Sequence, residues 1–309
     1  MHKLLILSDC GTDVPSFPAE FSVTALPVEA DASERRRALC EAEIVIGEPT
    51  LAELSCAEKL RWVQMTWAGA DRYLHGGFPP NVLLTTASGA FGVTIAEHAL
   101  AMLLSLCRRL PSYWGRTDAA DLGSELALHG KTALIFGTGD IGQNIAHRLS
   151  AFGVRCLGVR RRAEALPHFE SVTDLNGAEA SLPQADFVLC AMPETPQTRG
   201  FLSEKRLSRM KRSAVLINVG RGGFVDTEAL TAALQDGRLF GAGLDVTQPE
   251  PLPPEHPLRT MRNVILTPHV AGVGFGHLPE TSEKIWAICR ENLTHYLRGE
   301  PLRNAVTLP

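Results

Sequence analysis

A glycine-rich turn between an apolar strand and a helix is the feature that most constrains the fold of this chain. The apolar run Thr132–Phe136 leads directly into Gly137-Thr138-Gly139-Asp140-Ile141-Gly142, and a helical pattern continues from Gln143 to Ala151. In this order the three glycines permit a tight turn, the approach of a pyrophosphate to the backbone, and close packing of the helix on the strand. The N–H groups at the start of the helix favour bound phosphate. The sequence therefore predicts a dinucleotide-binding fold.

The strand before this turn belongs to a regular series. Short β-rich runs alternate with helical patterns along most of the 309 residues, which is typical of α/β proteins with parallel sheets, and the length predicts about two domains. A long helix is expected over residues 94–110, ended by Pro111. A last helix, over 279–297, is expected to return to the first domain. Strands are expected at 4–7, 44–47, 62–65, 83–86, 132–136, 155–159, 187–190, 214–219, 243–246 and 264–267.

Charge, cysteine content and hydropathy exclude several classes of protein. The formal net charge is −4, from 30 basic and 34 acidic residues, so nucleic acid is not expected as a partner. The seven cysteines are odd in number and form no CxxC pair, which fits free thiols in a reducing cytosol. No apolar run approaches the ~20 residues of a membrane span, and the N-terminus has no signal-peptide core. We expect a cytoplasmic protein that does not bind membranes.

The end of the second strand after the glycine turn bears on the choice of cofactor. At this position an acidic side chain selects NAD, whereas an arginine can accommodate the 2′-phosphate of NADP. Here strand 155–159 is followed by Arg160, Arg161 and Arg162, and no acid occurs before Glu164. A run of charges is often only a solvated surface, but this run occupies the discriminating position. The sequence favours NADP(H) over NAD(H).

Three later strands end in side chains that suit one reaction. Arg221 lies among glycines after one strand, Glu250 follows the next, and His269 follows the last. Parallel strands deliver such residues to the edge of the sheet where ligands bind. The arginine can hold a substrate carboxylate and polarise a keto oxygen, the histidine can donate a proton, and the carboxylate favours the protonated imidazole. Each could be structural if taken alone, but together they predict hydride transfer to a 2-keto acid.

These motifs together resemble the D-isomer-specific 2-hydroxyacid dehydrogenase family over nearly the whole chain. The resemblance implies that Arg221 binds substrate, that His269 is the catalytic acid/base and that Glu250 supports it. No HxH or HExxH pattern occurs, so no metal is expected. The matching segments are Ala68-Gly69-Ala70-Asp71, Thr94-Ile95-Ala96-Glu97-His98, the glycine turn, 218–222, 245–251 and 267–272.

Further roles come from the resemblance alone. Backbone N–H groups around Ala68 and Gly69 would hold the substrate carboxylate. Two Rossmann-like domains with doubly wound parallel sheets are implied: a smaller, substrate-binding domain built from both chain ends (1–97 plus 277–309), and a dinucleotide-binding domain (98–276). A homodimer formed through the cofactor domains is expected. The remaining cofactor contacts are expected at Thr94, Met192, Pro193, Val219, Gly220, Asp245, His269 and Gly272, beside the glycine turn, Arg160 and Arg161.

The arginine run directs the functional hypothesis to one branch of this family. We expect NADPH-dependent reduction of small 2-keto acids, such as glyoxylate or hydroxypyruvate, to D-2-hydroxy acids. NAD-dependent oxidation of a larger hydroxy acid such as 3-phosphoglycerate, and a cofactor-sensing binding protein, are the alternatives. Two features depart from the family pattern: bulky Trp67 precedes the substrate loop and could restrict the pocket, and the connector 112–128 carries Trp114. The physiological substrate and direction do not follow from the sequence.

Overall fold

The protein consists of two compact α/β units. A computed structural model describes residues 1–8, 14–118, 123–272 and 278–308. Unit 1 comprises Met1–Phe91 with Val273–Pro309, and unit 2 comprises Gly92–Gly272. This division assigns Thr94 to unit 2, whereas the boundary expected from the sequence, after residue 97, gives it to the smaller domain. The second expected boundary, between 276 and 277, lies outside the described residues.

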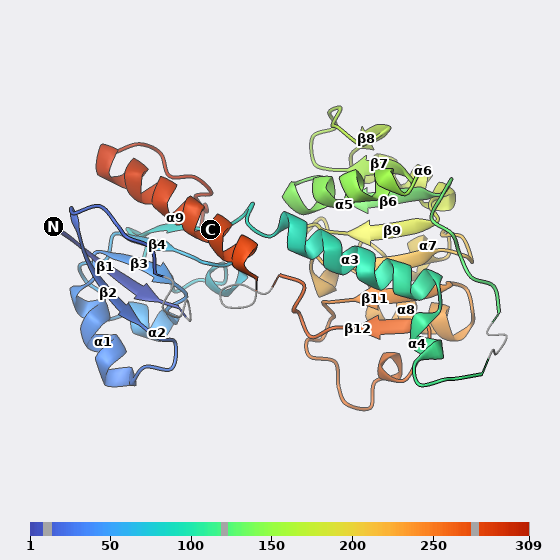
Figure 1. Cartoon of the computed structure of the whole chain (residues 1–309), viewed down its shortest axis with the longest axis horizontal. Coiled ribbons are helices and arrows are strands. Elements are labelled where there is room, and N and C mark those ends of the chain that lie inside the picture. The colour runs from blue at the N-terminus through green and yellow to red at the C-terminus, as the bar shows by residue number, and fades with distance from the viewer. Residues whose placement is uncertain (9–13, 119–122, 273–277, 309) are drawn as a thin grey trace. The chain divides into compact units, whose positions relative to one another are not determined.

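Unit 1 is built on a five-stranded parallel sheet in the order β2-β1-β3-β4-β5 (Figure 1). Its strand β2 was not expected from the sequence, because this edge strand buries only its first residue fully and exposes the next four. The strands are β1 (His2–Leu7), β2 (Phe21–Leu26), β3 (Ile44–Gly47), β4 (Trp62–Gln64) and β5 (Leu83–Thr85). The helices are α1 (Ala32–Glu41), α2 (Leu51–Leu54), the 3₁₀ turn Asp71–Tyr73, and α9 (Pro279–Arg298).

Helix α9 completes unit 1 from the other end of the chain. Asn292 Nδ2 donates a hydrogen bond of 2.7 Å to Gln64 Oε1, and both side chains are buried. The ring of Tyr296 stacks on Trp62 with centroids 5.5 Å apart. Burial of two amide side chains costs free energy unless their polar atoms are hydrogen-bonded, so this contact specifies where the helix docks. The expected return of the last helix to the first domain is confirmed.

Unit 2 is built on a seven-stranded parallel sheet in the order β12-β11-β10-β9-β6-β7-β8 (Figure 1). The chain begins this sheet at β6 and fills it outward in both directions, so the strand order reverses beside β6. Ligands of such sheets bind at the carboxyl ends of the strands near this reversal. The strands are β6 (Thr132–Phe136), β7 (Arg155–Val159), β8 (Ser171–Thr173), β9 (Phe187–Cys190), β10 (Val215–Asn218), β11 (Gly241–Leu244) and β12 (Val264–Leu266).

The first long helix of unit 2 is shorter than expected. Helix α3 (Gly92–Cys107) ends before the residue in the left-handed region, Arg109 at φ 52°, and Pro111 lies in the first turn of the next helix, α4 (Leu110–Tyr113). Proline suits that position because the first N–H groups of a helix need no intrahelical acceptor. The other helices are α5 (Asp140–Ala151), α6 (Leu175–Ser181), α7 (Glu204–Leu207) and α8 (Thr227–Gln235), with 3₁₀ turns at Leu182–Gln184, Gly222–Phe224 and Pro257–Arg259.

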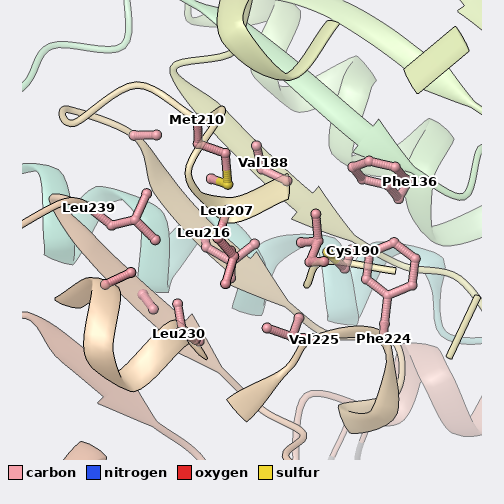
Figure 2. Close-up of a cluster of buried hydrophobic side chains, with 14 of the residues drawn as sticks. Phe136, Val188, Cys190, Leu207, Met210, Leu216, Phe224, Val225, Leu230 and Leu239 are labelled. Atoms are coloured by element: carbon pink, nitrogen blue, oxygen red, sulfur yellow. The ribbon is translucent and has the colours of Figure 1, made fainter. Parts of the chain in front are cut away.

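A hydrophobic core fixes the central strands of unit 2. Figure 2 shows apolar side chains from β6, β9 and β10 facing those of α7 and α8. Phe136, Phe201 and Phe224 form a cluster of rings whose centroids lie 5.1–5.4 Å apart. Because aromatic side chains bury large areas and pack in defined geometries, this cluster anchors β6 just before the glycine turn. No helix in the described ranges is long and apolar enough to cross a membrane.

Candidate active site

The glycine turn after β6 has the geometry that its sequence predicts. Gly137 adopts φ 91°, and a Cβ atom there would lie 2.5 Å from the carbonyl oxygen of Ala191. A Cβ atom at Gly142 would overlap the carbonyl oxygen of Gly137, so α5 packs tightly on the turn. Around the position of a Cβ atom at Gly139, in contrast, no atom lies within 4 Å. This open space over the turn fits a pyrophosphate group.

The side chains of the turn also fit a bound phosphate. The carboxylate of Asp140 lies against Gly92 and accepts a hydrogen bond of 3.1 Å from Asn144 Nδ2. The carboxylate is thus engaged in contacts within unit 2, while the first N–H groups of α5 lack intrahelical acceptors and are suited to hold the anion. Thr138 Oγ1 is buried and finds no hydrogen-bond partner among the described residues. Because of these features, the residues of the turn are suited to bind a dinucleotide.

Arginines stand at the end of β7, as the sequence indicates. Arg160 is half-buried, its backbone N–H donates to the carbonyl oxygen of Thr173, and its guanidinium forms an ion pair with Glu164. Arg161 and Arg162 are exposed. A carboxylate that pairs with Arg160 from four residues away leaves the guanidinium positively charged and holds it near the strand end. The strand end is therefore cationic.

The loops that follow β6, β9 and β10 contact one another through backbone atoms. A Cβ atom at Gly220 would lie 2.7 Å from the carbonyl oxygen of Met192, which leaves no space for a side chain. Val219 is buried, and its N–H donates to Cys190 O at 3.0 Å. Met192 is half-buried and Pro193 is exposed, both shortly after β9. The structure thus brings these predicted cofactor residues to the same edge of the sheet as the glycine turn.

Arg221 is held in a tight loop after β10. Asn218 Oδ1 accepts a hydrogen bond from the N–H of Gly220 at 3.1 Å, and Asn218 Nδ2 donates to the carbonyl oxygen of Arg221 at 3.0 Å. The half-buried guanidinium donates to Gly220 O at 2.8 Å. A side chain at Gly222 would overlap the backbone of Thr247, so this loop packs directly on the loop after β11. Arg221 is therefore presented at the carboxyl edge on a braced backbone.

His269 and Glu250 meet as the sequence analysis expects. His269 Nδ1 lies 2.6 Å from Glu250 Oε1, although the two residues come from the loops after β12 and β11. Both side chains are partly exposed, at 51% and 40%. The backbone of His269 is in the left-handed region at φ 56°, which costs free energy for a residue other than glycine and persists only where neighbours enforce it. The residues around His269 enforce this backbone conformation.

Asp245 holds the turn that carries His269. Its buried carboxylate accepts hydrogen bonds from the N–H groups of Val270 and Ala271 at 2.9 and 3.0 Å, and from Thr267 Oγ1 at 2.6 Å. Its carbonyl oxygen accepts the N–H of His269 at 2.9 Å. The resemblance implies a cofactor contact for Asp245. In the structure its side chain is engaged by the backbone of the turn and by Thr267, and it holds the turn in place.

His98 and Thr267 extend this network and were missed as site residues from the sequence. His98 Nε2 lies 3.0 Å from Thr267 Oγ1, whose single proton goes to Asp245. His98 Nε2 is therefore the donor in that contact. The signal was present, because His98 lies one helical turn after Thr94 in a family motif and Thr267 precedes Pro268 in another. Neither motif shows that the two residues touch.

The remaining predicted residues occupy ordinary positions. Thr94 is half-buried in the first turn of α3, and Gly272 is half-buried two residues after Val270. In unit 1, Ala68 is exposed and Gly69 half-buried in the loop after β4. The ring of Trp67 is 52% exposed, with the Arg72 guanidinium 5.3 Å from its centroid. Within the described parts of the chain, no three His, Cys, Asp or Glu side chains gather in a way that could hold a metal ion.

Comparison with known proteins identifies the family. The family model of the D-isomer specific 2-hydroxyacid dehydrogenase, NAD binding domain, matches residues 100–271. The chain belongs to this family. The resemblance drawn from the motifs is confirmed, as is the expected architecture of two parallel-sheet domains. The protein is therefore an oxidoreductase that uses a nicotinamide cofactor, and the glycine turn of unit 2 lies within the matched NAD binding domain.

Relatives of this 2-hydroxyacid dehydrogenase span most of its length. A human glyoxylate reductase/hydroxypyruvate reductase is 35% identical over 77% of this chain and 71% of its own. The structure of a D-isomer specific 2-hydroxyacid dehydrogenase family protein from Aeromonas salmonicida has a TM-score of 0.86 at 31% identity, covering 99% of both chains. An NADPH-dependent glyoxylate/hydroxypyruvate reductase from Sinorhizobium meliloti, solved with NADP and sulfate, has a TM-score of 0.83 at 25% identity, covering 99% of this chain and 98% of its own.

Proposed function

We propose that this enzyme reduces small 2-keto acids, such as glyoxylate or hydroxypyruvate, to D-2-hydroxy acids with NADPH. The observation that carries the proposal is the 2.6 Å contact between His269 Nδ1 and Glu250 Oε1, on a turn that Asp245 holds in place. A histidine paired with a carboxylate is a proton donor suited to neutral pH. The human and Sinorhizobium meliloti relatives carry names of this activity.

The proton is supplied by His269. Because Nδ1 faces Glu250, the other ring nitrogen, Nε2, is the one that donates to the keto oxygen of the substrate. The Glu250 carboxylate contacts Nδ1 and fixes the orientation of the ring. After donation the imidazole is neutral and regains its proton from solvent. A bound nicotinamide cofactor supplies the hydride that the keto carbon receives.

Arg221 of unit 2 is suited to bind the substrate. The guanidinium can bind a carboxylate through two parallel N–H donors, or polarise the adjacent keto oxygen as negative charge develops there. Ala68 and Gly69 each offer a backbone N–H that no acceptor in the described ranges engages. Successive backbone N–H groups form an anion site that needs no charged side chain. These two N–H groups would thus suit the carboxylate of a keto acid.

The cationic end of β7 supports NADPH as the preferred cofactor. Arg160 and Arg161 stand where the 2′-phosphate is recognised in dinucleotide folds, and a guanidinium binds phosphate bidentately. The Sinorhizobium meliloti relative, solved with NADP, agrees with this assignment. We also propose that the protein works as a homodimer in the cytoplasm, as the family resemblance suggests.

A panel of 2-keto acids tested with both cofactors checks the proposal. We expect glyoxylate or hydroxypyruvate to consume NADPH, followed by its absorbance, with kcat/KM at least about tenfold higher than with NADH. Efficiency with NADH equal to or above that with NADPH would refute the role of Arg160. Turnover confined to NAD and 3-phosphoglycerate would favour the oxidative alternative, and turnover of none of these compounds would favour the cofactor-sensing protein.

A further inference from the structure

Glu48 lies beside the loop of unit 1 that contains Ala68 and Gly69. It directly follows β3, and Thr66 follows the neighbouring strand β4. The two strands pair in parallel with Ile46 opposite Gln64, so the register places Glu48 opposite Thr66. Glu48 therefore stands at the carboxyl edge of the sheet, where the chain turns into the loop.

The carboxyl group of Glu48 accepts hydrogen bonds from the first N–H groups of this loop. Oε1 accepts the N–H of Thr66 at 2.7 Å and the N–H of Trp67 at 3.2 Å. Thr66 Oγ1 lies 3.1 and 3.2 Å from the two carboxyl oxygens. One side chain thus engages two successive backbone N–H groups. Such a contact fixes the orientation of the peptide between them, because both N–H vectors must converge on one oxygen.

Trp67, the next residue of the loop, is also held through its carbonyl oxygen and its ring. The carbonyl oxygen of Trp67 accepts the N–H of Ala87 at 2.8 Å. Arg72 donates to the carbonyl oxygen of Glu48 at 3.2 Å, and its guanidinium stacks over the ring of Trp67. With the N–H and C=O of Trp67 both engaged, the direction of the following peptides is set. The two N–H groups after Trp67 are left without an acceptor in the described residues.

The environment of Glu48 explains how a carboxyl group can sit near an anion site. Burial raises the pKa of Glu48 above its usual value, against the opposing effect of hydrogen bonds from Thr66 and Trp67 and of the Arg72 charge. A raised pKa favours the neutral form of the carboxyl group, which still accepts hydrogen bonds and repels a bound carboxylate less than the charged form does. Glutamine has the same shape and keeps the acceptor without a charge.

We propose that Glu48 is the positioning residue that orients the N–H groups of Ala68 and Gly69 for the substrate carboxylate. The inference rests on the proposed function, which assigns the carboxylate to these two groups. Glu48 does not touch the reacting atoms itself. It acts through the peptide bonds of Thr66 and Trp67, and its loss would allow the loop to rotate away from the binding conformation.

Steady-state kinetics of two variants test this role. Glu48→Ala removes the acceptor and is expected to raise KM for the keto acid about tenfold or more, the loss expected for a hydrogen bond to a carboxyl group, while kcat stays within about threefold. Glu48→Gln retains the acceptor and is expected to restore KM to within about threefold of the wild type. Glu58→Ala, at an exposed position of the same unit, serves as the matched control.

Hydrogen exchange gives a readout that does not depend on turnover. The amides of Thr66 and Trp67 should be protected in the wild type and in Glu48→Gln, and should exchange rapidly in Glu48→Ala. If the amides show this exchange pattern but the protein reduces no keto acid, the proposed function is refuted. The role of Glu48 in orienting the loop is not refuted by that result. An unchanged KM in an active Glu48→Ala variant, or protection that persists in it, would overturn the role of Glu48.

Discussion

At the scale of single residues, His269, the proposed catalytic acid, depends on contacts that its own chemistry does not reveal. The 2.6 Å contact with Glu250 orients the ring, whereas Asp245 fixes the backbone by accepting two N–H groups of the turn. A buried carboxylate is tolerated there because hydrogen bonds replace its hydration. His98 reaches the same network through Thr267. The proposed proton donation by His269 therefore relies on a preorganised turn.

Glu48 gives a prediction for stability against pH. Its pKa is raised in the folded protein above the ordinary value of 4.5, so the folded state binds its proton more tightly than the unfolded state does. The stabilisation is fully present below about pH 4.5 and is lost as pH rises through the raised pKa. Glu48→Gln does not titrate. Thermal unfolding between pH 4 and 8 should therefore show a Tm advantage of the variant that grows with pH, and an advantage that shrinks with pH would contradict this prediction.

At the scale of elements, the sequence predicted most strands, and the exceptions have physical causes. The central strands β6 and β9 were predicted to the residue, because strands buried on both faces are continuously apolar or nearly so. The edge strand β8 was missed, since it has three residues and none is fully buried. Strand β11 begins two residues earlier than predicted. Its glycines weaken the strand signal, but a Cβ atom at Gly243 would lie 2.8 Å from Ile217.

The candidate site likewise contains some residues that the sequence reveals and others that it does not. Arg221, Glu250 and His269 could be found because each follows a strand that the sequence shows clearly. The contribution of Asp245 to the turn could not be predicted, since it depends on the left-handed backbone of His269. Glu48 could not be found either, because its contact with Thr66 depends on the register of two strands.

The glycine turn allows a matched pair of variants. Gly142→Ala would place a methyl group against the carbonyl oxygen of Gly137, so urea denaturation should show a loss of about 1–3 kcal/mol in the free energy of unfolding. Gly139 has φ −78° and open space around it, so Gly139→Ala should fold with nearly unchanged stability. That variant should nevertheless bind NADPH about tenfold more weakly, because the methyl group occupies the space proposed for the pyrophosphate. Equal effects of both variants on stability would be inconsistent with these separate roles.

At the scale of the whole molecule, the two chain ends cooperate in one unit while the middle of the chain forms the other. Helix α9 docks on the sheet of unit 1 through Asn292 and Tyr296, so the fold of unit 1 requires residues that come after unit 2 in the chain. Unit 1 therefore cannot be completed until the whole of unit 2 has been synthesised.

The proposed homodimer is a prediction about the assembled protein. Light scattering of the purified chain should give a mass of about twice the 33.5 kDa of one chain, at all concentrations used in the assays. Trp114, in the connector 112–128, is exposed, and residues 119–122 of this connector lie outside the described residues. A monomer mass at micromolar concentration would exclude the dimer.

Replacement of His269 by alanine tests the proposed reaction most directly. With Glu250 left in place, kcat for reduction of glyoxylate or hydroxypyruvate with NADPH should fall by about 100-fold or more, the usual contribution of a positioned general acid. Affinity for NADPH should stay within about threefold, and His75→Ala, at an exposed position, should match the wild type. If His269→Ala retains the wild-type kcat, the imidazole does not supply the proton and the proposed mechanism is wrong.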